Sequence, residues 1–145
     1  EPLLKLAAEL GVANDVDLPG FVDNPFALMK RAAVFVQSSC FEGLPTVLVE
    51  ALACGTPVVA TDCPGGTREI LDDGAFGRIC PVGDARALAD AIQHALDQPS
   101  PAAGFERKAR EFSLDAMADA YLRAGLEPRA GEVPARALNI RGSAL

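Results

Sequence analysis

The sequence predicts an α/β protein built on a parallel β-sheet with helices on both faces. Two observations carry this prediction. Short apolar runs at residues 33–36 and 58–61, with a third strand pattern at 77–80, are typical of buried parallel strands. Segments with the three- and four-residue spacing of amphipathic helices separate these runs. Parallel strands joined in this way need crossover helices, so the pattern favours a Rossmann-like sheet.

Each predicted element depends on a local pattern. The elements are, in chain order, a helix over 3–10, a strand over 16–18, a helix from 24–25, a strand over 33–36, a helix over 45–54, a strand over 58–61, a short helix over 67–71, a strand over 77–80, and helices over 84–96, 102–112 and 114–124. Thr67 and Asp84 are predicted to cap their helices. Gly55 is predicted to end the helix that Pro45 begins. The strand at 33–36 is predicted to be buried on both faces.

Length and composition are those of one soluble domain. The chain has 145 residues, of which 50% are hydrophobic and 23% charged, so it can bury a core. We expect residues 1–128 to form the domain. Residues 129–145 are rich in Ala, Arg and Gly with weak periodicity, and we expect them to be disordered. No apolar run reaches the roughly 18 residues of a membrane span, and we expect a cytoplasmic protein.

Charge and cysteine content narrow the classes of partner. The formal net charge of −7 argues against a nucleic-acid partner, because phosphate backbones require clustered Lys and Arg. The four cysteines match no zinc-ligand spacing, and we interpret them as small buried hydrophobic residues of a reducing compartment.

Three predicted loops follow the carboxyl ends of strands, where open parallel sheets bind ligands. They cover residues 19–24, 37–44 and 62–67. The loop over 37–44 places Glu42 after a strand and Gly43 directly before a helix. Free backbone N–H groups at the start of that helix, together with a helix dipole of about half a positive charge, form a predicted anion site.

Glu50 lies within the same helix among apolar neighbours. A carboxylate in such surroundings is costly to bury unless it is paired. Two interpretations stay open from the residues alone: a solvent-facing edge of the helix, or hydrogen bonds accepted from a bound ligand. Glu42 taken alone is equally compatible with an ordinary solvated loop residue.

The two glutamates and their surroundings together resemble the Glu-x7-Glu signature of the group 1 retaining glycosyltransferases, which have the GT-B fold. The resemblance extends over roughly residues 3–125. The blocks that carry it are Leu18-Pro19-Gly20-Phe21-Val22, Phe41-Glu42-Gly43-Leu44-Pro45, Val49-Glu50-Ala51-Leu52-Ala53-Cys54-Gly55-Thr56-Pro57-Val58-Val59-Ala60, Gly65-Gly66-Thr67-Arg68-Glu69-Ile70 and Gly77-Arg78-Ile79-Cys80-Pro81-Val82-Gly83-Asp84.

The resemblance implies a role for each matched residue. Glu42 would be the catalytic residue: it would hold hydroxyls of the transferred sugar and help to stabilise oxocarbenium-like charge. Glu50 would bind the ribose hydroxyls. The remaining implied donor-binding residues are Gly43, Leu44, Pro45 and Thr46 at the sugar and diphosphate, and Phe21 and Val22 at the base. Pro45 has no N–H to donate, and Gly65-Gly66 is either a close approach to the sugar or a plain turn.

By the same resemblance, the chain is the C-terminal, donor-binding half of a hexosyltransferase. It would act on a nucleoside-diphosphate sugar with no cofactor and no metal, and would serve bacterial surface polysaccharide synthesis. The glycan or lipid-linked acceptor would be held by an N-terminal domain that this chain lacks, and the full-length parent could contact the inner face of the membrane. The opening strands, which usually carry an Arg and a Lys for the diphosphate, are also expected to be absent. We therefore expect weak donor binding and no transfer by the isolated chain.

Two alternatives belong to other classes. A sugar-nucleotide epimerase shares the fold, but it would be expected to carry a different His and acid constellation, and no His lies near the loops. A truncated, non-catalytic half-domain fits the short chain, whereas the intact Glu42–Glu50 block favours an active parent.

Overall fold

The computed structural model describes residues 2–98 and 102–126. In order, its elements are α1 Pro2–Glu9, the short 3-10 helix η1 Ala13–Asp15, α2 Pro25–Arg31, β1 Phe35–Gln37, α3 Thr46–Ala53, β2 Val58–Thr61, α4 Thr67–Leu71, the 3-10 turn η2 Asp72–Gly74, β3 Arg78–Cys80, α5 Ala85–Asp97, α6 Phe105–Arg110 and α7 Leu114–Leu126. The tail predicted for residues 129–145 lies outside the described residues. The predicted alternation of helices and strands is confirmed from α2 to α5.

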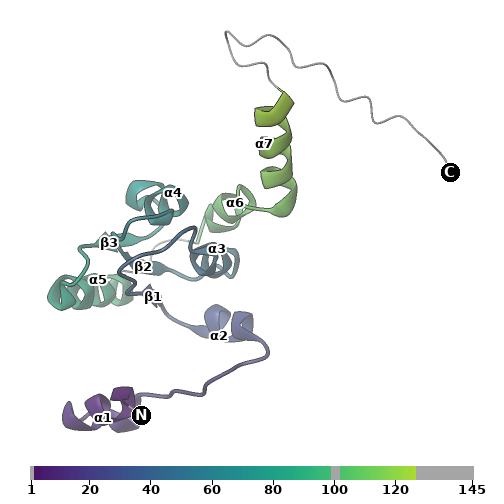
Figure 1. Ribbon diagram of the computed structural model, residues 1–145. Helices are drawn as coiled ribbons and strands as arrows, with labels where there is room; N and C mark the ends of the chain where they lie inside the picture. The colour runs from purple at the N-terminus through teal and green to yellow at the C-terminus, as the bar shows by residue number, and fades with distance from the viewer. Residues whose placement is uncertain (1, 99–101, 127–145) are drawn as a thin grey trace.

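The three strands form a parallel sheet in the order β1-β2-β3, so β2 is central and buried along its whole length. Val58 and Ala60 belong to the core beneath α3, while Val59, which alternates with them, is fully buried on the opposite face. Helix α5 packs against β2 and β3, and α3 packs against β1 and β2 (Figure 1). The predicted sheet with helices on both faces is therefore confirmed.

The core is centred on α3, because this helix is apolar around most of its circumference. Leu48 and Leu52 are fully buried, which stabilises the fold by about 2 kcal/mol for each side chain. The helix ends as predicted. Gly55 adopts a φ of +77° and donates its N–H to Leu52, while the N–H of Thr56 reaches the carbonyl of Ala51. These two bonds satisfy carbonyls at the end of α3.

The prediction of a strand at 33–36 buried on both faces is wrong in position and in burial. The strand is β1 Phe35–Gln37, and Val36 is 36% exposed. Within the described residues, β1 is an edge strand that pairs only with β2. Helix α3 covers the face that carries Phe35, whereas the face that carries Val36 remains open to solvent.

Two other local predictions are wrong. Residues 16–18 form no strand: Val16 is extended, but no backbone hydrogen bond in the described chain involves residues 16–18, and a strand needs a neighbour that accepts and donates. Thr67 does not cap α4. It is the first helical residue, follows Gly66, and turns its hydroxyl inward to within 3.7 Å of the buried Cys63 Sγ.

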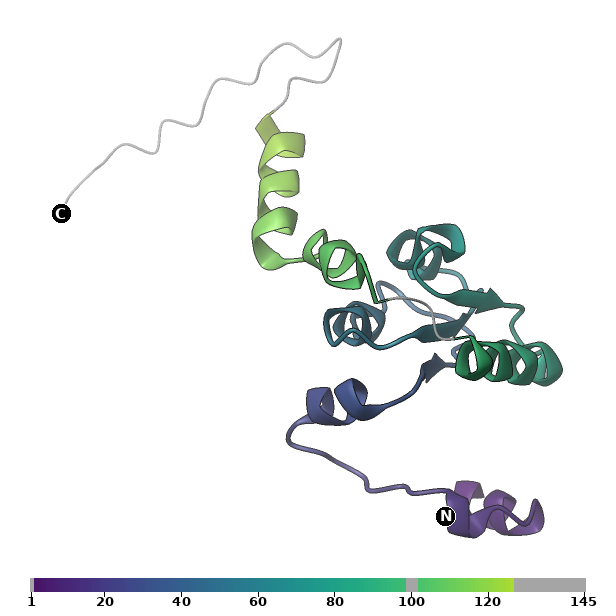
Figure 2. The same cartoon turned by 180° about the vertical axis from the view of Figure 1, so that it is seen from behind.

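Helices α1 and α7 lie apart from the sheet, at opposite ends of the molecule (Figure 2). Apolar side chains on and beside them are largely exposed: Leu3 on α1 and Leu10, just after α1, are 63% and 67% exposed, and Tyr121 on α7 is 86% exposed. The predicted cap is confirmed at α5, where Asp84 accepts from the N–H of Ala87, and Asn24 caps α2 in the same way by accepting from the N–H of Ala27.

Candidate functional site

Glu42 is a partly buried carboxylate that the preceding residues hold in place. Its Oε1 accepts a hydrogen bond of 2.9 Å from Gln37 Nε2 and one of 2.7 Å from Ser39 Oγ. Gln37 ends β1, so the sheet itself positions one of the two donors. The hydroxyl of Thr61, at the end of β2, donates to the Ser39 carbonyl at 2.5 Å and so fixes the other. The carboxylate is thereby oriented by the ends of two neighbouring strands.

The loop that follows β2 packs directly on the Glu42 loop. The N–H of Glu42 donates to the carbonyl of Pro64 at 3.1 Å, and the N–H of Gly66 donates to the carbonyl of Gly43 at 2.8 Å. Gly65 has a φ of +127°, and a Cβ atom there would overlap the carbonyl oxygen of Glu42. The glycine pair therefore serves the contact between two loops, which the sequence left open as either a close approach or a plain turn.

The set of free backbone amides at the N-terminus of α3 differs from the predicted set. Helix α3 begins at Thr46, one residue after Pro45, and no side chain caps it. The N–H of Thr46 donates to the Leu44 carbonyl at 2.8 Å and is therefore not among the free amides of this structure. In the described chain, the amides of Gly43 and Leu44 have no hydrogen-bond partner. These two N–H groups, that of Val47 in the first turn of α3, and the helix dipole are what remains for an anion.

Glu50 lies on α3 at the edge of a second feature, a pocket of about 450 Å³. The side chain is partly buried, and its carboxylate has no hydrogen-bond or ion-pair partner among residues 2–98 and 102–126. Apolar groups of Phe26, Cys54, Ala109 and Phe112 line the same pocket. Glu50 is therefore a carboxylate beside an apolar surface with its hydrogen-bonding capacity unused, which suits a ligand with both a flat apolar part and hydroxyl groups.

Phe21 and Val22 are not gathered at either glutamate. Phe21 is 92% exposed and Val22 partly buried, and both lie in the irregular segment that precedes α2. The sequence contains one Asp-x-Asp, Asp15-Val16-Asp17, so a metal-free reaction cannot be argued from the lack of that motif. Both of these aspartates are exposed: Asp15 is the last residue of η1, and Asp17 lies two residues beyond it.

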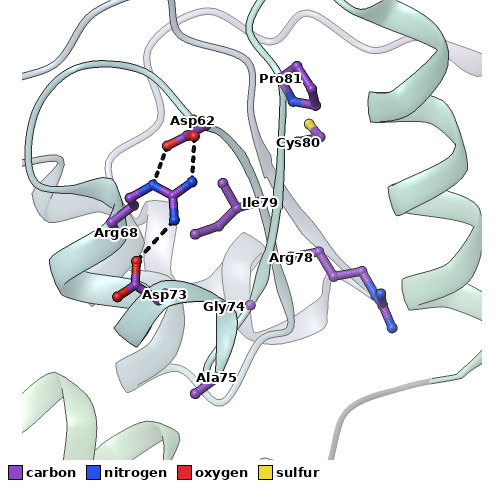
Figure 3. Close-up of a pocket in the computed structure, with 10 residues that line it drawn as sticks. Asp62, Arg68, Asp73, Gly74, Ala75, Arg78, Ile79, Cys80 and Pro81 are labelled. Atoms are coloured by element: carbon purple, nitrogen blue, oxygen red, sulfur yellow. Dashed lines mark hydrogen bonds and ion pairs between the residues drawn. The ribbon is translucent and has the colours of Figure 1, made fainter.

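A larger polar pocket of about 520 Å³, which the sequence patterns did not predict, lies beside β3. Figure 3 shows Arg68 between Asp62 and Asp73, whereas Arg78 extends away from this group. Arg68 donates to both oxygens of Asp62, at 2.8 and 2.6 Å, and to Asp73 at 3.0 Å. These bonds hold the pKa of Asp62 below its ordinary value and raise that of Arg68. The pairing ties the start of the 62–67 loop to α4, with one guanidinium shared between two carboxylates.

Cys80 lines this pocket but is not suited to nucleophilic chemistry. Burial raises the pKa of its thiol, and the negative charge of Asp84 adds to the shift. A protonated thiol is a weak nucleophile. Cys80 and Cys63 are buried, as the sequence predicted, whereas the prediction is wrong for Cys40, which is exposed, and for Cys54, which is only partly buried.

Comparison with known proteins gives the family. The sequence model described as glycosyl transferases group 1 matches residues 1–112. The chain belongs to this family. The resemblance to the group 1 glycosyltransferases is thus confirmed.

The relatives and the solved structures agree with this assignment. The chain is 34% identical to the N-acetylgalactosamine-N,N'-diacetylbacillosaminyl-diphospho-undecaprenol 4-alpha-N-acetylgalactosaminyltransferase of Campylobacter jejuni, over 76% of this chain and 30% of that protein. It is 36% identical to the lipopolysaccharide core biosynthesis glycosyltransferase LpsE of Rhizobium meliloti, over 83% and 37%. The crystal structure of Anabaena Alr3699/HepE in complex with UDP matches with a TM-score of 0.76 and 26% identity, over 86% and 36%.

The chain spans about a third of the length of these relatives. Its fold is that of one part of the GT-B glycosyltransferases. Among the described residues of this glycosyltransferase chain, no helix combines the length and the apolar character needed to cross a membrane.

Proposed function

We propose that the chain is the donor-binding portion of a hexosyltransferase that transfers a sugar, with retention of configuration, from a nucleoside-diphosphate sugar to a glycan or lipid-linked acceptor. The observation that carries the proposal is the fixed Glu42 carboxylate beside the uncapped N-terminus of α3. A carboxylate held in this way accepts hydrogen bonds from sugar hydroxyls, and helix N–H groups favour phosphate.

In this proposal each site residue contacts a different part of the donor. Glu42 contacts the transferred sugar and stabilises positive charge as its bond to the diphosphate breaks. The amides of Gly43 and Leu44 face the diphosphate. Glu50 accepts hydrogen bonds from the ribose hydroxyls, which would use the capacity that its pocket leaves free. Phe21 and Val22 contact the base, and their exposure leaves them accessible to it.

The relatives support the class of donor and of pathway. HepE of Anabaena is described with UDP, and LpsE of Rhizobium meliloti is described in lipopolysaccharide core synthesis. We therefore propose a nucleoside diphosphate as leaving group and bacterial surface polysaccharide synthesis as the setting, in the cytoplasm at the inner face of the membrane. We propose that no metal or other cofactor takes part, because the assigned carboxylates and amides contact sugar, ribose and diphosphate directly.

Charge limits what this chain does alone. Within the described residues, no Lys or Arg side chain joins the hydrogen-bonded group around Glu42. A diphosphate bound there is balanced only by N–H groups and a helix dipole of about half a charge. We therefore propose that the isolated chain binds donor weakly and transfers nothing without further protein that supplies positive charge and the acceptor site.

Saturation-transfer NMR with UDP-, GDP- and ADP-sugars tests this function. The wild-type chain should saturate the ribose protons of at least one of these donors. Glu50→Gln, which keeps the shape but removes the charge, should weaken binding roughly ten-fold, the size expected for hydrogen bonds to an ionised group. Glu69→Gln, at an exposed position on α4, is the matched control and should bind as the wild type does. No saturation with any donor, or equal binding by Glu50→Gln, would refute the assigned site.

A further inference from the structure

Gln37 has a buried polar side chain, and only one of its two polar atoms is hydrogen-bonded. The residue is only 9% exposed. Its Nε2 donates to Glu42, but its Oε1 is buried and has no hydrogen-bond partner among the described residues. A buried acceptor without a partner costs stability, because it has lost water and gained nothing in return.

Because of that cost, packing alone does not explain a glutamine at this position. Gln37 faces the same side of the sheet as Phe35, which packs on the apolar core under α3. An apolar side chain of similar shape would fill the position without leaving an unpaired acceptor. The only hydrogen bond that the Gln37 side chain makes in the described chain is the one to Glu42. The polar side chain of Gln37 therefore serves to orient the Glu42 carboxylate.

Ser39 completes the arrangement from the other side. Its hydroxyl donates to the same oxygen, Glu42 Oε1, and Thr61 holds its backbone carbonyl. Two donors on one oxygen fix the plane of the carboxylate. In the described chain, Glu42 Oε2 has no hydrogen-bond partner. One oxygen is thus anchored and the other is left available.

We propose that Gln37 and Ser39 are positioning residues that hold Glu42 Oε1 so that Oε2 accepts a hydrogen bond from a hydroxyl of the donor sugar. This role rests on the proposed function of Glu42. The role therefore affects one part of the donor only. Binding of the transferred hexose depends on Gln37, whereas binding of the ribose, which Glu50 provides, does not.

The test is the ratio of saturation at the hexose protons to saturation at the ribose protons of one bound nucleotide-sugar. Gln37→Met removes the donor and keeps the volume, and Ser39→Ala removes the second donor. In both variants the ratio should fall to roughly half of the wild-type value or less, with ribose saturation retained. Gln93→Met is the matched control, because Gln93 Nε2 also donates to a carboxylate at 2.9 Å, that of Asp97, but on the exposed side of α5. It should leave the ratio unchanged.

The outcomes separate this role from the function on which it rests. No saturation of any ligand proton by the wild type would refute the proposed function, and the positioning role with it. Ribose saturation without hexose saturation in the wild type, or an unchanged ratio in Gln37→Met and Ser39→Ala, would refute the positioning role alone. Urea denaturation of Gln37→Met distinguishes a structural role: a lower midpoint with an unchanged ratio overturns the assignment, whereas an equal or higher midpoint with a reduced ratio supports it.

Discussion

Gly65 and Glu42 are packed backbone against backbone, with no room between them for a side chain. A Cβ atom on Gly65 would overlap the carbonyl oxygen of Glu42 and would lie 2.7 Å from that of Gly43. The loop that follows β2 is therefore seated on the loop that carries the candidate catalytic residue. Because the two loops are packed together, a substitution in one should change the structure or stability of the other.

Gly65→Ala should destabilise the chain by about 3 kcal/mol or more, because it combines an unfavourable φ with a backbone overlap. Gly74→Ala is the matched control: its φ is +104°, but a Cβ atom there meets no atom within 4 Å. It should carry only the conformational cost, about 1 kcal/mol. The midpoints of urea denaturation measure both. Equal losses would show that the loops separate freely and would contradict the close contact.

The Asp62–Arg68 pair should make stability depend on pH at the acid end. The hydrogen bonds from Arg68 lower the pKa of Asp62 in the folded chain, although partial desolvation opposes them. A carboxyl whose folded pKa is depressed stabilises the fold fully above its unfolded pKa of about 4, and this contribution is lost as the pH falls through the folded pKa.

Arg68→Met is the variant that measures this effect. Its deficit in urea midpoint relative to the wild type should be present at neutral pH and should shrink below about pH 4. Arg86→Met, at an exposed position on α5, should show no such change. A deficit of Arg68→Met that is constant from neutral to acid pH would mean that the ion pair does not form in solution.

Leu52 and Leu122 should respond very differently to truncation. Leu52 is fully buried between α3 and the sheet, whereas Leu122 on α7 is 60% exposed. Leu52→Ala should cost about 3 kcal/mol through lost contacts and a cavity, and Leu122→Ala less than about 0.5 kcal/mol. Comparable losses would indicate that α7 packs on the rest of the chain in solution, contrary to its exposure here.

Local signals predicted the elements whose causes are local. The apolar pattern of α3, the Gly55 terminus and the Asp84 cap depend on residues within a few positions of one another. Val16-Asp17-Leu18 has a strand-like pattern, but a strand depends on a partner that no single segment reveals. The same reason explains β1: its edge position, and so the exposure of Val36, follows from the sheet as a whole.

The sequence patterns singled out the two glutamates of the candidate site but not the residues that hold Glu42 in place. Glu42 and Glu50 were found from their spacing and surroundings. The predicted strand at 33–36 ends one residue before β1 does and so excludes Gln37, whose bond to Glu42 depends on how the chain reverses after β1. The Arg68 pairing joins residues five and six positions apart around a turn, and no periodic pattern marks it.

The most direct test of the proposed donor site is to map the residues that contact a bound nucleotide-sugar. Amide chemical-shift mapping with ¹⁵N-labelled protein and a nucleotide-sugar titration gives the answer residue by residue. We predict that the largest shifts fall on Gly43 and Leu44 and along α3 to Glu50, with the Gln37 side-chain amide among them. Shifts confined to the polar pocket around Arg68 and Arg78, or no shifts at saturating ligand, would contradict the placement of the donor site at Glu42 and Glu50.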